Sequence, residues 1–210
     1  MQVLSTNLGK PKTFLWNGKE EQTGIFKYPV DEPLFLRHND VAKDTIINRV
    51  NHGGEHKACY LFSSDNYPYW KKEYSHLKWN WGMFGENLTV SGLDESIVRI
   101  GDIYKIGTAL TQVSQPREPC YKLGVRFDDP AILKKFIHHR HPGTYVRILE
   151  EGEVKKGDGL ELIEQSKNTL TVQQFYDLMF EKEKSEKILH LFMDNPSVPQ
   201  YKKERLKKYL

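Results

Sequence analysis

The sequence predicts a mainly β protein, a barrel or sandwich with a few interspersed helices, followed by a small domain of three helices. Short β-branched and aromatic runs, broken by glycine, asparagine and proline, fill the first part of the chain. After Gln165 the apolar residues change to helical spacing. A chain of 210 residues can hold a medium domain with a small appendage. We therefore expect two units, a β domain over residues 1–165 and a three-helix domain over residues 166–210.

Five runs in the first part have the composition of strands. They cover residues 24–28, 87–90, 103–106, 109–113 and 145–149. The doublets Gly101-Asp102 and Gly157-Asp158 each lie beside a strand, as hairpin turns require.

Two helices are expected to interrupt the strands. The first begins near Ser64 and carries the aromatic residues Tyr67, Tyr69, Trp70 and Tyr74. The second has Asp129 as its cap and Pro130 in its first turn. Its apolar face comprises Ile132, Leu133, Phe136 and Ile137. Both are interpreted as packing elements.

Three amphipathic helices are predicted in the tail. Thr171 and Gln174 have the spacing of a capping box, which marks a helix start. The apolar residues that follow on one side are Val172, Phe175, Tyr176 and Met179. A second helix is expected over residues 185–192, and a third opens at Ser197 and ends in a lysine-rich turn, which complements the helix dipole or docks an acidic partner.

The composition excludes several classes of protein. With 38% hydrophobic and 28% charged residues, and no apolar window near the ~18 residues of a membrane span, the chain is expected to be soluble. The first residues lack a secretory signal, so we expect a cytoplasmic protein with reduced thiols. A net charge of +3 is too small to indicate nucleic-acid binding, and a small anionic ligand fits better.

The two cysteines are far apart and form no Cys-x-x-Cys pair, which argues against a disulfide framework or a structural zinc site. Cys59 lies in an apolar run and is predicted to be core. The cluster of His138, His139 and His141 does not favour a metal site, because adjacent helical side chains point about 100° apart. A solvated helix end is the preferred interpretation.

The segment Gln115–Cys120 is the most informative for chemistry. Its two prolines restrict the backbone around Arg117, so the Cys120 thiol is expected to be held at a strand-to-loop junction. Arg117, Lys122 and Arg126 are cations that favour a thiolate, the form that attacks electrophiles or binds a soft metal. The alternative is a buried, inert thiol, which composition alone favours by roughly two to one.

Two further segments contain candidate binding residues. Gly53 and Gly54 allow backbone amides to approach an anion, and His52 and Lys57 can donate to a phosphate. The alternative is a plain glycine turn.

Glu86 and Asn87 follow a glycine-rich stretch and enter a strand, so they can face a ligand. An ordinary turn closed by Asn87 explains the same spacing.

Taken together, these segments resemble the stand-alone bacterial members of the MOSC family, of the YiiM-like group, over nearly the whole chain, including the three-helix tail. The motifs that carry the resemblance are Thr23–Lys27, His52–Gly54 with Lys57, Gly85–Leu88, Ile100–Asp102, Gln115–Arg117 with Pro119-Cys120, and Gly143–Tyr145.

The resemblance implies a MOSC-type β-barrel that holds a pterin-based molybdenum cofactor, with Cys120 as the metal ligand. Members of the group are similar to reductases of N-hydroxylated compounds such as hydroxylaminopurines, supplied with electrons by flavin or iron–sulfur partner proteins. By resemblance, Arg117 and Lys57 anchor the phosphate and pterin, and Lys122 is counted with them. The implied pocket-lining residues are His52, Gly53, Gly54, Glu86 and Asn87.

The chain departs from the family pattern at one position, and other functions stay open. The family often has two aspartates four apart, whereas Asp44 is followed here by Asn48. Nothing marks a Schiff-base lysine, so pyridoxal phosphate is not expected. The alternatives to a reductase are a carrier that holds persulfide sulfur or the cofactor on Cys120, and a structural barrel without a ligand.

Overall fold

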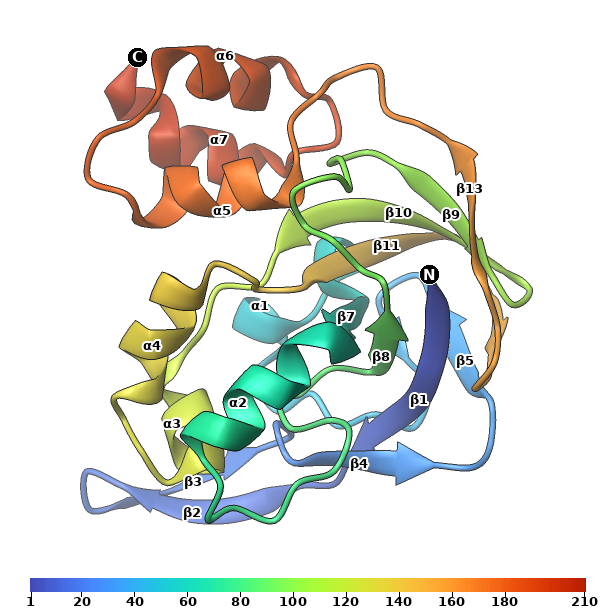
Figure 1. The fold of residues 1–210 in the computed structure, drawn as a ribbon, viewed down its shortest axis with the longest axis vertical. Helices are drawn as coiled ribbons and strands as arrows, with labels where there is room; N and C mark the ends of the chain where they lie inside the picture. The colour runs from blue at the N-terminus through green and yellow to red at the C-terminus, as the bar shows by residue number, and fades with distance from the viewer.

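The computed structural model describes residues 1–210, apart from the side chains of Val50 and Asn51. Its main element is an eight-stranded sheet (Figure 1). In spatial order the strands are β13 (Leu160–Glu164), β9 (Ile103–Ile106), β10 (Ala109–Pro116), β11 (Thr144–Glu150), β7 (Cys59–Ser63), β8 (Leu88–Ser91), β1 (Gln2–Gly9) and β4 (Lys27–Val30). Neighbouring strands are antiparallel, except that β7 and β8 run parallel.

Two smaller sheets accompany the main one. One contains β12 (Gly152–Val154), β5 (Leu34–Arg37) and β6 (Asp40–Val41), and the other is the hairpin of β2 (Lys12–Trp16) and β3 (Lys19–Thr23). The predicted strand over residues 24–28 begins only at Lys27. Gly24 lies instead against the loop at Thr45, where an added Cβ would meet the Thr45 carbonyl oxygen at 2.0 Å.

The main sheet curls so that β13 begins beside the start of β1. Backbone hydrogen bonds join Val3 N to Asp158 O (2.9 Å) and Leu160 N to Met1 O (3.1 Å), around a single bridge between Gln2 and Gly159. The prediction of a sheet-rich fold with several helices is confirmed. Full closure into a barrel stays a prediction, because these contacts are a bridge and not a paired strand.

The interspersed helices are α1 (Arg49–His52), α2 (Tyr67–Glu73), α3 (Tyr121–Phe127) and α4 (Ile132–His139). Helices α2 and α4 confirm the two that were expected. Cys120 was expected at a strand-to-loop junction, whereas it lies at a loop-to-helix junction, after the end of β10 and directly before α3. Gly124 has a low helix propensity but lies inside α3, where the absence of a side chain lets it pack against Pro130; an added Cβ would be 3.2 Å from Pro130 Cα.

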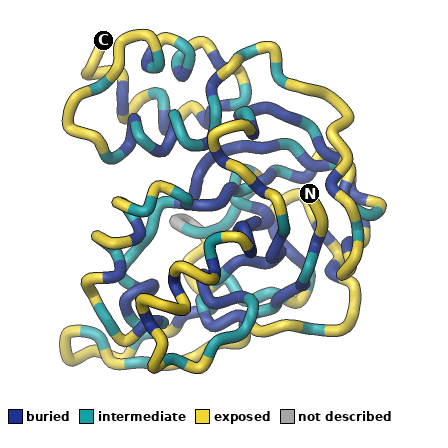
Figure 2. The backbone as a smooth tube through the Cα atoms, viewed as in Figure 1, coloured by how far each residue is buried: buried dark blue, intermediate teal, exposed yellow. Residues whose placement is uncertain are grey.

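The hydrophobic core has two parts, and their residues lie in the dark blue, buried stretches of the tube in Figure 2. The first lies inside the curled sheet and continues into the C-terminal helices. The second is mostly aromatic and packs under α2, α3 and α4, with the rings of Phe62 and Phe84 stacked at 4.2 Å. This second part forms one side of the site described below.

Three helices close the chain, α5 (Val172–Phe180), α6 (Glu186–Asp194) and α7 (Gln200–Leu206), followed by a 3-10 turn over Lys207–Tyr209. The capping box of α5 is present, with Gln174 N donating to Thr171 Oγ1 at 3.1 Å. A division into two domains after residue 165 stays a prediction. Among the described residues, no helix is both long and apolar enough to cross a membrane.

Candidate functional site

A cavity opens between the main sheet, α1 and the segment that leads into α3. Its empty space is about 720 Å³, counted out to its open mouth. Much of the lining comes from three short segments, residues 23–25, residues 44–48, and Phe84, Gly85 and Asn87. The remaining lining residues are Lys27, His52, Lys57, Ala58, Tyr60, Arg117, Glu118, Cys120, Lys122 and Tyr145.

Cys120 lies at the boundary of this cavity and a second, adjoining hollow. The second hollow shares His52, Lys57, Glu118, Cys120 and Tyr145 with the first and adds Gln115, Pro116 and Pro119. Cys120 has an extended backbone (φ −123°, ψ 168°) and is partly exposed. The predicted accessible thiol is therefore consistent with the structure, whereas Cys59 is fully buried, as predicted, and burial raises its pKa to about 12.

The end of β10 connects the cysteine segment to the segment that contains His52 and Lys57. The carbonyl oxygen of His56 accepts from Ser114 Oγ at 2.7 Å and from Gln115 Nε2 at 3.1 Å. Both donors are buried. These two bonds bring together motifs that lie about sixty residues apart in the chain.

Arg117 is a buried cation with incomplete hydrogen bonding. It is 5% exposed, and its guanidinium carbon lies 5.3 Å from the ring centroids of both Tyr60 and Phe136. Its Nη1 is buried and has no hydrogen-bond partner among the described residues. A buried donor on a cation is costly without an acceptor, so an anion in the cavity would satisfy it.

Other cations surround the same space. The pKa of His52 is lowered to about 4 by burial and by Lys57, Arg117 and Lys122. Lys122 Nζ donates to the carbonyl oxygen of Gln22 in the β2–β3 hairpin at 3.1 Å. At neutral pH His52 is therefore an uncharged imidazole within a positive field.

Asp44 organises the opposite wall. Its carboxylate pairs with Lys27 Nζ at 2.5 Å and accepts from Asn87 Nδ2 and from the Gly9 amide, both at 2.9 Å. The Asn87 side-chain oxygen accepts from the Tyr60 amide at 3.2 Å. Asn87 lines the cavity as predicted, but both ends of its amide are used to brace the wall. Sequence reasoning noted Asp44 only for the departure at Asn48, which also lines the cavity.

Three predicted lining residues lie outside the set that lines either hollow. Glu86 is fully buried, and its carboxylate accepts from Tyr67 Oη, Gly82 N (2.9 Å), Phe84 N (3.1 Å) and Thr89 Oγ1 (2.8 Å). The prediction that Glu86 faces the ligand is wrong, since it holds the 82–86 turn from behind. Gly85, next to it, lines the cavity instead.

Gly53 and Gly54 are the other two predicted lining residues that line neither hollow. Gly54 has φ +91°, and an added Cβ on Gly53 would be 3.1 Å from the carbonyl oxygen of Arg49. Lys57 N donates to the Gly54 carbonyl oxygen at 2.9 Å. The glycines therefore form a tight turn, as the alternative interpretation had it, but the neighbouring His52 and Lys57 line the cavity.

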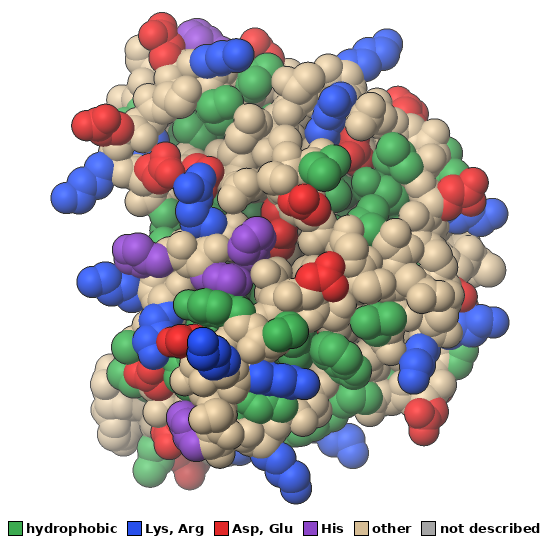
Figure 3. Space-filling model, viewed as in Figure 1, with side chains coloured by type: hydrophobic (Ala, Val, Ile, Leu, Met, Phe, Trp, Pro, Cys, Tyr) green, Lys and Arg blue, Asp and Glu red, His purple; other side chains and the backbone are tan. Residues whose placement is uncertain are grey.

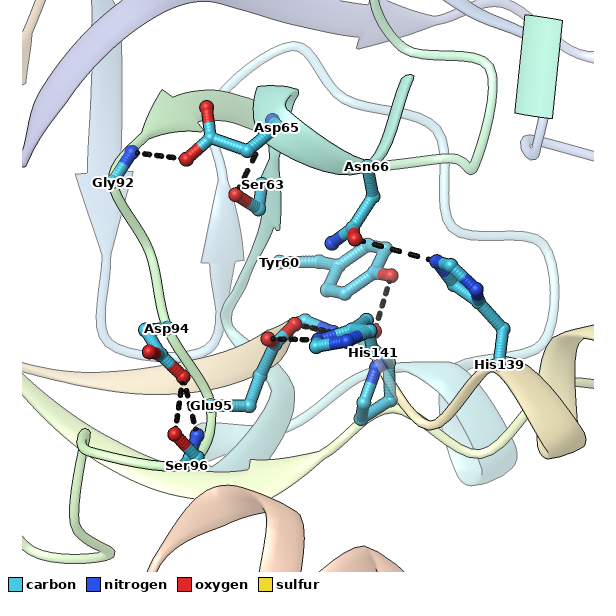
Figure 4. A network of polar contacts seen from close by, with 12 residues as sticks. Tyr60, Ser63, Asp65, Asn66, Gly92, Asp94, Glu95, Ser96, His139 and His141 are labelled. Atoms are coloured by element: carbon cyan, nitrogen blue, oxygen red, sulfur yellow. Dashed lines mark hydrogen bonds and ion pairs between the residues drawn. The ribbon is translucent and has the colours of Figure 1, made fainter. Parts of the chain in front are cut away.

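Figure 4 shows a polar network around Tyr60, whose ring also contacts the Arg117 guanidinium. The Tyr60 hydroxyl donates to the Pro142 carbonyl oxygen at 2.7 Å. The buried Glu95 carboxylate accepts from Gly143 N at 2.9 Å and contacts His141 Nδ1 at 3.0 Å. The loop at Pro142 is thus fixed on both sides. These residues come from distant segments, and no sequence spacing indicated the network.

The histidines near residue 140 gather on one face of the molecule (Figure 3). His139 stacks on Tyr69 at 4.3 Å, and burial with nearby His141 lowers its pKa to about 4. The hydrogen bond with Glu95 raises the pKa of His141. The expectation of a merely solvated helix end is therefore wrong for these two. Within the described residues no three potential ligands group to hold a metal ion.

Comparison with known proteins identifies the family. Residues 48–161 match the MOSC domain. This chain belongs to the MOSC family. It is 42% identical over 171 residues to the uncharacterized protein YflK of Bacillus subtilis, covering 81% of this chain and 77% of YflK. The crystal structure of YiiM from Geobacillus stearothermophilus superposes with a TM-score of 0.82 and 31% identity, over 99% of this chain and 97% of YiiM.

A third relative carries a name that refers to activity. A protein of Gibberella moniliformis named "Reductase" is 37% identical over 150 residues, which cover 70% of this MOSC protein. The match spans 27% of the fungal protein. The expected resemblance to the MOSC family and to YiiM is confirmed.

The residues of this MOSC site fit a phosphorylated group that carries a soft metal. The unpartnered Arg117 Nη1 and the nearby Lys57 and Lys122 are suited to phosphate. Cys120 offers a partly exposed sulfur on the same cavity. A thiolate is a preferred ligand for soft transition-metal centres.

Proposed function

We propose that this MOSC protein binds a pterin-based molybdenum cofactor and reduces N-hydroxylated compounds such as hydroxylaminopurines. The observation that carries the proposal is the buried guanidinium of Arg117, with its unpartnered Nη1, on the same cavity as the accessible Cys120. The relative named as a reductase supports a redox activity. A flavin or iron–sulfur protein is the proposed electron donor.

Each residue has a distinct role in this proposal. Arg117 and Lys57, with Lys122, hold the phosphate and the pterin, and Cys120 supplies the thiolate ligand. When bound, the cofactor would supply the two-electron chemistry that removes oxygen from the N–O group. His52 stays neutral at pH 7, so one ring nitrogen can donate a hydrogen bond to the oxygen of a bound substrate while the other can accept one. Asp44 and Asn87 keep the opposite wall rigid.

Replacement of Cys120 by alanine tests the ligand assignment. After expression in a host that makes the cofactor, we expect wild-type protein to contain molybdenum and pterin and to reduce a hydroxylaminopurine. Cys120→Ala should lose at least about 100-fold in activity, because losing even an outer-shell partner of a metal ligand costs about 10–100-fold. Cys59→Ala is the matched control, since that thiol is buried and does not line the cavity. Full activity of Cys120→Ala would show that the assignment is wrong.

The same preparations distinguish the carrier alternative. A persulfide carrier would show a labile sulfur adduct on Cys120 by native mass spectrometry without bound pterin, and a cofactor carrier would show bound pterin without turnover. Arg117→Met is the companion variant, because it removes the guanidinium and keeps a similar apolar length. We expect it to lose pterin and molybdenum together, whereas Cys120→Ala loses the metal first.

A further inference from the structure

Glu118 places an acid in the cationic half of the cavity. Its side chain lines the main cavity and the adjoining hollow, next to Arg117 and Cys120. The other lining carboxylate, Asp44, is neutralised by Lys27. An anion that approaches Arg117 would be repelled by a free carboxylate at the neighbouring residue.

Helix α7 neutralises this carboxylate from outside the sheet. Lys202 Nζ forms an ion pair with Glu118 Oε1, and Arg205 Nη1 bonds Oε2 at 2.8 Å. The Lys202 side chain is 6% exposed, whereas that of Arg205 is 53% exposed. The Lys202 pair is thus shielded from water and salt, and the Arg205 pair is not.

Helix α7 also holds the start of the cysteine segment. Tyr201 Oη donates to Gln115 Oε1 at 2.9 Å, and its ring centroid lies 6.0 Å from Lys57 Nζ. Burial lowers the pKa of Lys202, and the charges of Lys57 and Arg205 lower it further. The segment from Gln115 to Glu118 is therefore fixed by two consecutive residues of one C-terminal helix.

We propose that Lys202 is a positioning residue for the anion site, because it holds and neutralises the Glu118 carboxylate so that the cavity stays cationic at Arg117. The C-terminal helices then complete the binding site and are not only an appendage. This inference rests on the proposed function, since it takes the cavity to bind a phosphate group.

Binding of inorganic pyrophosphate, measured by isothermal titration calorimetry at constant ionic strength, tests the proposal. Lys202→Met should weaken pyrophosphate binding by about 10-fold, because the Glu118 carboxylate would then repel the anion at close distance. The double variant Glu118→Gln with Lys202→Met should recover binding to within about 3-fold of wild type, because the repelling charge is gone. Lys203→Met, the next residue of α7, is the control and should bind like wild type.

The double variant distinguishes a loss of charge neutralisation at Glu118 from a loss of structure at α7. If Lys202 only anchored α7, removing Glu118 as well would not restore pyrophosphate binding, and that result would overturn the proposal. Unchanged binding by Lys202→Met would overturn it too. If wild type and Arg117→Met fail equally to bind pyrophosphate, the anion site itself is refuted and the proposed function loses its main support. Binding by wild type but not by Arg117→Met keeps that function, whatever Lys202→Met shows.

Discussion

Among single residues, His52 is the most direct reporter of the charge in the cavity. Its pKa is lowered from 6.5 to about 4 by burial and three nearby cations, so the folded protein resists its protonation. The unfolded chain takes up this proton first as the pH falls below 6.5. The contribution of His52 to stability is therefore full above pH 6.5 and is lost between pH 6.5 and about 4.

We expect the His52 imidazole to titrate near pH 4 in an NMR experiment on the free protein, with the variant His52→Gln used to assign its signal. Added pyrophosphate should raise this pKa, because a bound anion offsets the cations. In urea unfolding, His52→Gln should lose less stability than wild type between pH 6.5 and 4. A pKa near 6.5 that ignores pyrophosphate would contradict the cationic cavity.

Residue identity predicted some of the site and not the rest, for physical reasons. One cavity is lined by Cys120, Arg117, Lys57, Lys122 and His52. These residues could be predicted because charged or reactive side chains lie there beside prolines or glycines that shape the backbone. The position of Glu86 was predicted wrongly, because the sequence does not distinguish a buried carboxylate that accepts four hydrogen bonds from a carboxylate that faces a pocket. Only tertiary contacts determine on which side of the 82–86 turn the Glu86 side chain lies.

At the scale of elements, the contact of Gly24 with the loop at Thr45 sets the shape of one cavity wall. An added Cβ at Gly24 would lie 2.0 Å from the Thr45 carbonyl oxygen, so the loop must move. We expect Gly24→Ala to lower the free energy of unfolding by about 2 kcal/mol or more and to weaken pyrophosphate binding. Gly159→Ala, where an added Cβ meets nothing within 4 Å, should change neither. Urea unfolding and calorimetry check both variants.

The elements show where periodicity succeeds and fails. Helices α4 and α5 were predicted from apolar residues on one face, and the capping box at Thr171 marked the start of α5. Helix α2 was predicted from a helix start near Ser64 and the aromatic residues that follow it. Helix α3 was missed because it is short and contains Gly124, a residue of low helix propensity. Packing of Gly124 close to Pro130 overrides its low helix propensity.

For the whole molecule, the continuity of the first core cluster decides how the protein unfolds. This cluster includes Val3 and Val90 of the sheet together with Phe175 and Phe192 of the C-terminal helices. Backbone bonds from Val172 N to Val98 O and from Gln173 N to Glu95 O, each 2.9 Å, join the same parts. Sequence alone could not show this continuity, because the change of periodicity after Gln165 indicates a boundary whether or not the two parts share a core.

We expect one calorimetric unfolding transition, with Phe175→Ala destabilising the whole of it by about 3–5 kcal/mol. The exposed variant Ile97→Ala is the control and should shift the transition little. Two transitions, of which Phe175→Ala moves only one, would instead support independent domains on either side of residue 165.

The two cysteines differ in exposure, so one of them can be labelled selectively in the native protein. Cys59 is sealed in strand β7, and Cys120 opens to solvent beside α3. A maleimide dye added to the native protein would therefore mark a single, known position at the mouth of the cavity. A second equivalent would react only when the sheet opens, so the count of attached dye measures occupancy of the site and integrity of the fold in one sample.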